Sequence, residues 1–377
     1  MKEIREILGA LAGLRARGES AALATIVRVK GSTYRRAGAR LLIRQDGTTL
    51  GSISGGCLEG DVAEAAREVL DTGRPRMLTY DLTADDDAVW GLGLGCNGAI
   101  DVFVEAVRPQ AVPDYGALLQ GCIDARRFAA LATVIASPSP DGRVPVGARL
   151  FVGEDGTVEG SLGDAVTDAL AAAAARDRIA AGTAATVPLE LPGGLGELFI
   201  DVVAPPLPLL VCGAGHDALP LVSLAHAQGW WVMVADSRPA YATKARFPGA
   251  DEVFLVQDRD VAKAARIDRH TFVVVMTHNF LHDLEILRCL VETPARYIGL
   301  LGPRARTDKL LAELRKDGVV LDGARRSRVY GPVGVDTGAD SPEEIALSIL
   351  AEILAVRNGR ATASLRDRVG PIHAPAS

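Results

Sequence analysis

The chain has 377 residues, which is long for one hydrophobic core and predicts two or three domains. Its composition (48% hydrophobic, 23% charged) is typical of globular proteins, and its net charge of −6 argues against electrostatic binding to nucleic acid or to an anionic membrane. The sequence shows no signal peptide, no apolar run of roughly 20 residues and only five cysteines, so we expect a cytoplasmic protein with reduced thiols.

Residues 1–205 contain an internal repeat. The sequence "AALATIV" at 21–27 returns as "AALATVI" at 129–135, "GARL" at 38–41 returns at 147–150, and "DGTTLGS" at 46–52 returns as "DGTVEGS" at 155–161. An alanine-rich helical stretch follows in each copy, and a β-like run opened by Asp101 or Asp201 closes it, with the offset falling from 108–109 to 100. We expect two units, about 20–108 and 128–205, that pair into one α+β domain.

Two cysteines embedded in glycines distinguish the copies. Copy one has "GSISGGCLEGD" and "GLGLGCNGAI", which contain Gly55, Gly56, Cys57, Gly95 and Cys96, whereas copy two has "GSLGDAV" and "GGLGELFI" at these places. Because the scaffold is shared and the thiols are not, the pattern favours a functional role for Cys57 and Cys96. The alternative is that either cysteine is a small buried filler.

A basic loop, "KGSTYRRAGAR" at 30–40, also belongs to copy one. Its adjacent Arg35 and Arg36 could make bidentate contacts to a phosphate or carboxylate, and copy two keeps only one comparable arginine, Arg143. The alternative is an ordinary solvated hairpin.

The second half, 206–377, begins after the linker "PPLP" and predicts a Rossmann-like domain with a parallel sheet. An apolar strand at 209–212 leads into Gly213-Ala-Gly215-His216-Asp217-Ala218, then a helix at 217–228 and a strand at 230–235 that ends at Asp236. Asp236 lies 23 residues after the first glycine, where the ribose-binding acid of such a unit is expected. This order of strand, glycine turn, helix, strand and acid strongly predicts the fold, but it is less specific evidence that the domain binds a nucleotide.

Further strands are predicted at 252–256, 271–278 and 296–302, with helices at about 259–266, 281–292 and 304–317. Ligands of such sheets bind outside the carboxyl ends of the strands, which here carry polar residues suited to anion binding or proton transfer. His278 and His282 have metal-compatible spacing, but His278 is expected in a loop, which disfavours a metal site. The residues at these ends are His216, Asp236, His278, His282, Asp283 and Arg304.

Together these stretches resemble the XdhC/CoxI family. The resemblance rests on "GSTYRRAGARLLI", "GSISGGCLEGDV", "GLGCNG", "CGAGHDALPL", "ADSRP", "VVVMTHNFLHDLEIL", "YIGLLGPRAR" and "GPVGVDTGADSPEEIALSILAEILA", which occur in the family's order over nearly the whole chain. Tyr34 and Pro303 depart from the family, which commonly has Pro and Ser there.

The resemblance implies a chaperone rather than an enzyme. Such proteins bind the molybdenum cofactor, protect it while a cysteine desulfurase installs its terminal sulfido ligand, and deliver it to xanthine dehydrogenase or a related molybdenum hydroxylase. The expected cofactor site comprises Cys57 and Cys96, which could also contact molybdenum, with Arg35, Arg36, Gly55, Gly56 and Gly95. The Rossmann-like crevice, with Gly213, Gly215, His216, Asp236, His278 and Arg304, would take the phosphate end of the cofactor or a separate nucleotide.

Two alternatives remain at this point. An NAD(P)-dependent oxidoreductase would use Gly213, Gly215 and Asp236 with His278 as acid or base, although no Tyr-x-x-x-Lys pair accompanies them. A non-catalytic docking module for the hydroxylase or the desulfurase would use the Rossmann-like domain as a platform. The alanine-rich helices would also suit a homodimer.

Overall fold

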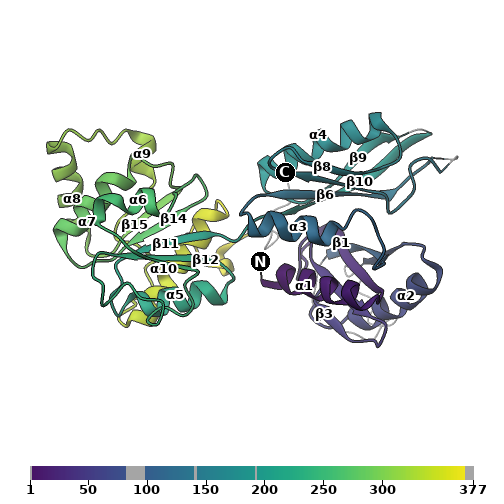
Figure 1. Ribbon diagram of the computed structural model, residues 1–377, viewed down its shortest axis with the longest axis horizontal. Helices are drawn as coiled ribbons and strands as arrows, with labels where there is room; N and C mark the ends of the chain where they lie inside the picture. The colour runs from purple at the N-terminus through teal and green to yellow at the C-terminus, as the bar shows by residue number, and fades with distance from the viewer. Residues whose placement is uncertain (1, 82–97, 140–141, 192, 370–377) are drawn as a thin grey trace. The chain divides into compact units, whose positions relative to one another are not determined.

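A computed structural model describes residues 2–81, 98–139, 142–191 and 193–369. The chain divides into two compact units, with Met1–Pro205 in the first and Pro206–Asp367 in the second (Figure 1). Each unit is described by itself below. Within the described ranges, no helix combines the length and the apolar character that a membrane crossing requires.

The first unit contains two antiparallel five-stranded sheets of the same design, which confirms the internal duplication. Copy one orders its strands β3-β2-β1-β5-β4 and copy two β8-β7-β6-β10-β9. The elements of copy one are β1 (Ala21–Gly31), β2 (Arg40–Arg44), β3 (Thr49–Gly51), α2 (Glu59–Thr72), β4 (Arg76–Asp81) and β5 (Gly98–Val107). Those of copy two are β6 (Ala129–Ala136), β7 (Arg149–Gly153), β8 (Val158–Ser161), α4 (Ala165–Ala181), β9 (Ala185–Leu191) and β10 (Gly194–Val203).

Alternation along the central strands gives each sheet two buried faces. In β1, Ala22, Ala24 and Ile26 pack under α2 in the core of copy one. The other face of β1 turns toward copy two, where Val27 packs with Phe103, Ile135 and Phe199. Helices α1 (Lys2–Arg17) and α3 (Tyr115–Asp124) pack together through Ile4, Leu8, Leu119 and Ile123.

The strand register corrects the predicted alignment at the end of each copy. Thr25 of β1 pairs with Phe103 and Thr133 of β6 pairs with Phe199, so Phe103 and Phe199 are equivalent. Asp101 therefore corresponds to Glu197 and not to Asp201, and the predicted offset of 100 is wrong. The sequence alignment was misleading because copy one has sixteen residues, 82–97, between β4 and β5, whereas copy two has only 192–193 between β9 and β10.

The second unit is a parallel sheet covered by helices on both faces, as predicted. Its strand order, β13-β12-β11-β14-β15-β16, is the order 3-2-1-4-5-6 of a Rossmann fold. The strands are β11 (Pro208–Cys212), β12 (Trp231–Asp236), β13 (Glu252–Leu255), β14 (Phe272–Val275), β15 (Tyr297–Leu300) and β16 (Val329–Tyr330). The helices are α5 (Ala218–Ala227), α6 (Val261–Ala264), α7 (Phe280–Leu290), α8 (Arg304–Lys316), α9 (Gly323–Ser327) and α10 (Pro342–Arg357), with short 3₁₀ turns at Asp258–Asp260 and Leu365–Asp367.

The two faces of this sheet carry separate cores. Helices α5 and α10 contribute Leu221, Ile349 and Ile353 to one core, and α7 and α8 contribute Leu287 and Leu310 to the other. Helix α10 begins with Ser341 and Glu344 in a capping box and with Pro342 at the first helical position.

Candidate functional site

The loop that carries Cys57 is held by a carboxylate at the start of α2. The Glu59 side chain accepts hydrogen bonds from the Ser52 hydroxyl (3.1 Å) and the Ser54 amide (3.0 Å), and also from the Ser54 hydroxyl. Burial alone would raise the pKa of Glu59, but these hydrogen bonds outweigh it and lower the pKa below its ordinary value. An ionised Glu59 therefore fixes both sides of the loop around Gly55-Gly56-Cys57.

Copy two contains the same bracing without the thiol. There Asp168 accepts from the Ser161 hydroxyl (2.7 Å) and the Leu162 amide (2.6 Å), which aligns Glu59 with Asp168. On this alignment Cys57 corresponds to Val166, whose side chain is 71% exposed. The two loops have the same length, so Cys57 and Val166 occupy equivalent positions and differ in the chemistry of their side chains.

The start of the helix also differs between the copies. Helix α4 begins at Ala165 because the Asp164 side chain accepts hydrogen bonds from the amides of Val166 and Thr167. Gly55 stands at the position of Asp164 and offers no such cap, so α2 begins only at Glu59. Copy one thus replaces a capped first turn by a loop with two exposed glycines, Gly55 and Gly56.

Cys57 is half-buried against the apolar core of copy one, and its thiol forms no disulfide. Gly56 has a φ of +109°, which favours glycine at that position. Gly95 and Cys96 lie outside the described residues, so their predicted partnership with Cys57 stays a prediction. The strands on either side place Cys96 in the connection between β4 and β5 that is much shorter in copy two.

The two arginines of the predicted basic clamp have different surroundings. Nη2 of Arg35 donates to both carboxylate oxygens of Glu3 in α1, at 2.7 and 2.6 Å. Arg36 is exposed on the same loop. Arg35 is therefore held by α1, where it anchors the loop.

In the second unit, the glycine turn after β11 takes the shape that the sequence predicts. Gly213 has a φ of +108°, and a Cβ at this position would lie 2.7 Å from the carbonyl oxygen of Met276. The turn therefore needs glycine for its conformation and for its close packing against the chain after β14. His216 follows as an exposed residue, and α5 begins at Ala218.

A histidine–aspartate contact spans the point where the strand order reverses. His278 Nε2 lies 2.6 Å from the Asp217 carboxylate, which joins the loop after β14 to the loop after β11. His278 has a φ of +61°, a left-handed conformation uncommon outside glycine. His278 thus lies in a loop, as predicted, at the edge of the sheet where Rossmann-type ligands bind.

Asp236, the predicted ribose-binding acid, is already fully hydrogen-bonded. Its Oδ2 accepts from the Ala214 amide (2.7 Å) and Arg238 Nη2 (2.7 Å), and its Oδ1 accepts from the amide and Nε of Arg238 (2.8 and 2.9 Å). The guanidinium of Arg238 lies 3.9 Å from the ring centroid of Tyr241. A ribose could reach Asp236 only by displacing Arg238, a residue that sequence inspection passed over.

Asp236 should stabilise the second unit in a pH-dependent way. Burial would raise its pKa, but the bonds from Arg238 and Ala214 outweigh burial and leave the pKa below its ordinary value. We expect Asp236→Asn to lower the free energy of unfolding by about 1–3 kcal/mol at pH 7. The difference in free energy of unfolding between Asp236→Asn and the wild type should shrink as the pH falls below about 3.9 and through the lowered pKa. The wild-type carboxylate is then protonated and is uncharged like the asparagine.

Urea unfolding at pH 7, 4 and 3 tests this expectation, followed by the fluorescence of Trp230 and Trp231 in a chain whose remaining tryptophan, Trp90, is replaced by phenylalanine. Asp260→Asn, at an exposed position of the same unit, is the control and should change little. Equal stability of Asp236→Asn and the wild type at pH 7 would contradict the expectation.

The same geometry predicts how the second unit responds to NAD. We expect Arg238→Ala to bind NAD more tightly than the wild type, by roughly 10-fold, because the competing charge-assisted bonds to Asp236 are gone. Isothermal titration measures both dissociation constants, with Arg259→Ala, an exposed change elsewhere in the unit, as the control. Weaker binding by Arg238→Ala would place this arginine on the nucleotide instead.

The remaining polar residues of the edge form separate pairs rather than one centre. His282 Nδ1 contacts Asp258, and Asp283 accepts from the Thr277 hydroxyl (2.5 Å) and from Arg306 Nη2 (2.6 Å). Arg304, which was predicted to line this edge, is exposed at the start of α8. The arginine that contacts Asp283 is instead Arg306, two residues later. Among the residues that the structure describes, no three His, Cys, Asp or Glu side chains are grouped to hold a metal ion.

Comparison with known proteins identifies the family. The sequence model of the XdhC and CoxI family matches residues 14–81 and again 122–189, and that of the XdhC Rossmann domain matches residues 209–353. The chain belongs to the XdhC and CoxI family. The family model matches each copy separately, in agreement with the duplication seen in the two sheets, and the resemblance predicted from sequence is confirmed.

Relatives of this XdhC/CoxI protein match it over most of their length. A probable xanthine dehydrogenase subunit of Bacillus subtilis (strain 168) is 34% identical, over 90% of this chain and 94% of that protein. The molybdenum cofactor insertion chaperone PaoD of Escherichia coli (strain K12) is 24% identical, over 90% of this chain and 84% of that protein. A crystal structure described as a xanthine dehydrogenase from Bacillus halodurans superposes with a TM-score of 0.76 at 32% identity, covering 97% of this chain and 98% of that one.

Proposed function

We propose that this XdhC/CoxI protein is a molybdenum cofactor insertion chaperone. It binds the cofactor, protects it while its terminal sulfido ligand is installed, and delivers it to xanthine dehydrogenase or a related molybdenum hydroxylase. The names of the relatives from Bacillus subtilis and Escherichia coli support this role. The structural observation that carries it is the Gly55-Gly56-Cys57 loop, which replaces a capped helix turn in only one of two equivalent copies.

The residues of this loop fit the proposed ligand. The cofactor supplies an oxidised molybdenum with sulfur ligands, and a thiolate is a soft donor suited to such a metal. The exposed backbone at Gly55 and Gly56 allows a flat pterin or a phosphate to approach main-chain amides. Cys57 would hold or shield the metal end, and the ionised Glu59 would keep the loop in shape. We also propose that Cys96 and Arg36 contribute from copy one.

Copurification tests the proposal directly. The full chain, isolated without oxygen from cells that make the cofactor, should carry molybdenum and pterin in equal amounts, approaching one of each per chain. The loaded protein should then activate an apo-hydroxylase, and more strongly when a cysteine desulfurase supplies sulfur. Protein that contains neither molybdenum nor pterin, yet captures the hydroxylase, would favour a docking module.

The Rossmann-type unit makes an NAD(P)-dependent oxidoreductase the rival function, but its geometry disfavours that role. The ribose-binding position at Asp236 is occupied by Arg238. We propose instead that the edge near Gly213 and Gly215 receives the phosphate of a separate nucleotide. Turnover of NAD(P) with any reduced or oxidised substrate would support the rival.

A further inference from the structure

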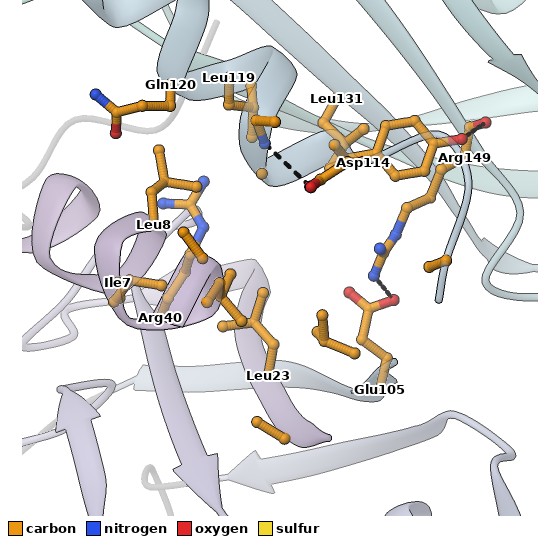
Figure 2. A pocket seen from close by; sticks show the side chains of 18 of the residues that line it. Ile7, Leu8, Leu23, Arg40, Glu105, Asp114, Leu119, Gln120, Leu131 and Arg149 are labelled. Atoms are coloured by element: carbon orange, nitrogen blue, oxygen red, sulfur yellow. Dashed lines mark hydrogen bonds and ion pairs between the residues drawn. The ribbon is translucent and has the colours of Figure 1, made fainter. Parts of the chain in front are cut away.

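A pocket of about 520 Å³ lies between the two copies of the first unit, away from the Cys57 loop. Helices α1 and α3 border it on one side and the facing sheets on the other (Figure 2). Its walls are mainly apolar, with Leu8 from α1, Leu119 from α3, Leu23 from β1 and Leu131 from β6. This volume lies within the range of sites that bury a small organic molecule.

The charged lining of the pocket has nearly twofold symmetry. Arg40 of copy one pairs with Asp201 of copy two, and Arg149 of copy two pairs with Glu105 of copy one. The register makes Glu105 equivalent to Asp201, and the repeated "GARL" makes Arg40 equivalent to Arg149. Two acids and two arginines therefore form two equivalent ion pairs between the copies, and their formal charges cancel.

Two polar groups that line the pocket have no partner in the described parts of the chain. The hydroxyls of Thr25 and Thr133 make no hydrogen bond there, and these residues are only 7% and 6% exposed. Buried polar groups normally find partners, so a pocket lined by two unsatisfied hydroxyls is poised to satisfy them with a ligand.

We infer that this pocket binds a neutral, mainly apolar small molecule whose polar end carries a carbonyl oxygen. The apolar walls bury the body of such a molecule, and the carbonyl accepts from the hydroxyl of Thr25 or Thr133. A charged ligand is disfavoured, because it would have to displace a member of an ion pair and leave a buried charge unpaired. The site is separate from the Cys57 loop, and its occupant does not depend on the proposed cofactor chemistry.

Nile red, a neutral fused-ring ketone that fluoresces in apolar surroundings, is the probe. We expect saturable binding of one molecule per full-length chain, and at least 10-fold weaker binding of the anionic 1-anilinonaphthalene-8-sulfonate. Leu131→Phe should fill part of the pocket and weaken Nile red at least 5-fold, whereas Val166→Phe, on the exposed start of α4, should not. Absent saturation, or equal binding by both phenylalanine variants, would overturn the inference.

A matched set of variants tests the polar groups. The double variant Thr25→Val with Thr133→Val removes both unpartnered hydroxyls and nearly keeps the shape of the side chains, so Nile red affinity should fall about 5-fold or more. Thr49→Val makes the same change at an exposed position of β3 and should alter affinity less than 2-fold. Circular dichroism verifies the fold of both. Equal affinities of the double variant and the control would refute recognition by the threonine hydroxyls.

Discussion

Replacing Cys57 by serine is expected to lower the molybdenum and pterin that copurify with the chain at least 10-fold. Serine keeps the size of the side chain and the loop geometry, but it removes the soft donor proposed to face the metal. The half-buried position of Cys57 against the core of copy one makes the thiol accessible while fixing its place. Metal analysis and pterin fluorescence of anaerobically purified protein measure the loss.

Cys289→Ser is the matched control for this change. Cys289 is also a half-buried free thiol, but it lies on α7 and donates to the Ile286 carbonyl oxygen at 3.0 Å. Burial raises its pKa, which makes it a poor thiolate. Its replacement should leave molybdenum and pterin content unchanged. Undiminished cofactor in Cys57→Ser would remove the thiol from the proposed site.

Asp201→Leu is expected to destabilise the first unit by about 3–5 kcal/mol, the cost of leaving a buried charge without its partner. The charge left behind is that of Arg40, whose side chain is only 13% exposed. Burial lowers the pKa of Arg40 to about 10, which is still far above neutral pH, so the guanidinium stays charged. Hydrogen exchange of peptides from β1, β5, β6 and β10, measured by mass spectrometry, reports the change in opening free energy.

The double variant Arg40→Met with Asp201→Leu should recover most of that loss, because neither charge then remains in the interior. Asp155→Leu breaks an exposed pair with Arg127 and should destabilise the unit far less than Asp201→Leu does. Equal destabilisation by the single and the double variant would show that the unpaired charge of Arg40 is not the cause of the lost stability.

The fold was largely accessible from the sequence because its patterns are local. The repeated segments and the glycine turn at Gly213 each lie within a few residues, and each predicted the element that the structure contains. Strands β4 and β9 and helix α3 were not predicted, since they lack a sharp alternation or a shared repeat. The predicted offset of 100 failed because a longer connection in copy one cannot be recognised before the strand register is known.

The site was less accessible, because its decisive contacts join residues far apart in the chain. The partners of Arg40 and Arg149 come from the opposite copy, and no spacing rule indicates them. Arg238 lies two residues after Asp236, a predicted site residue, yet only the structure shows that its guanidinium binds the Asp236 carboxylate. Cys57 could be singled out from sequence because a second copy of the same unit, with Val166 in its place, supplied the comparison.

The two ion pairs that join the copies make each half of the first unit depend on the other. Each copy contributes one arginine and one carboxylate, and each of these pairs with a residue of the opposite half. A single copy standing alone would therefore lose both pairs. The first unit thus resembles a homodimer whose two subunits are joined in one chain, and one half carries the Gly55-Gly56-Cys57 loop while the other keeps a capped helix at that place.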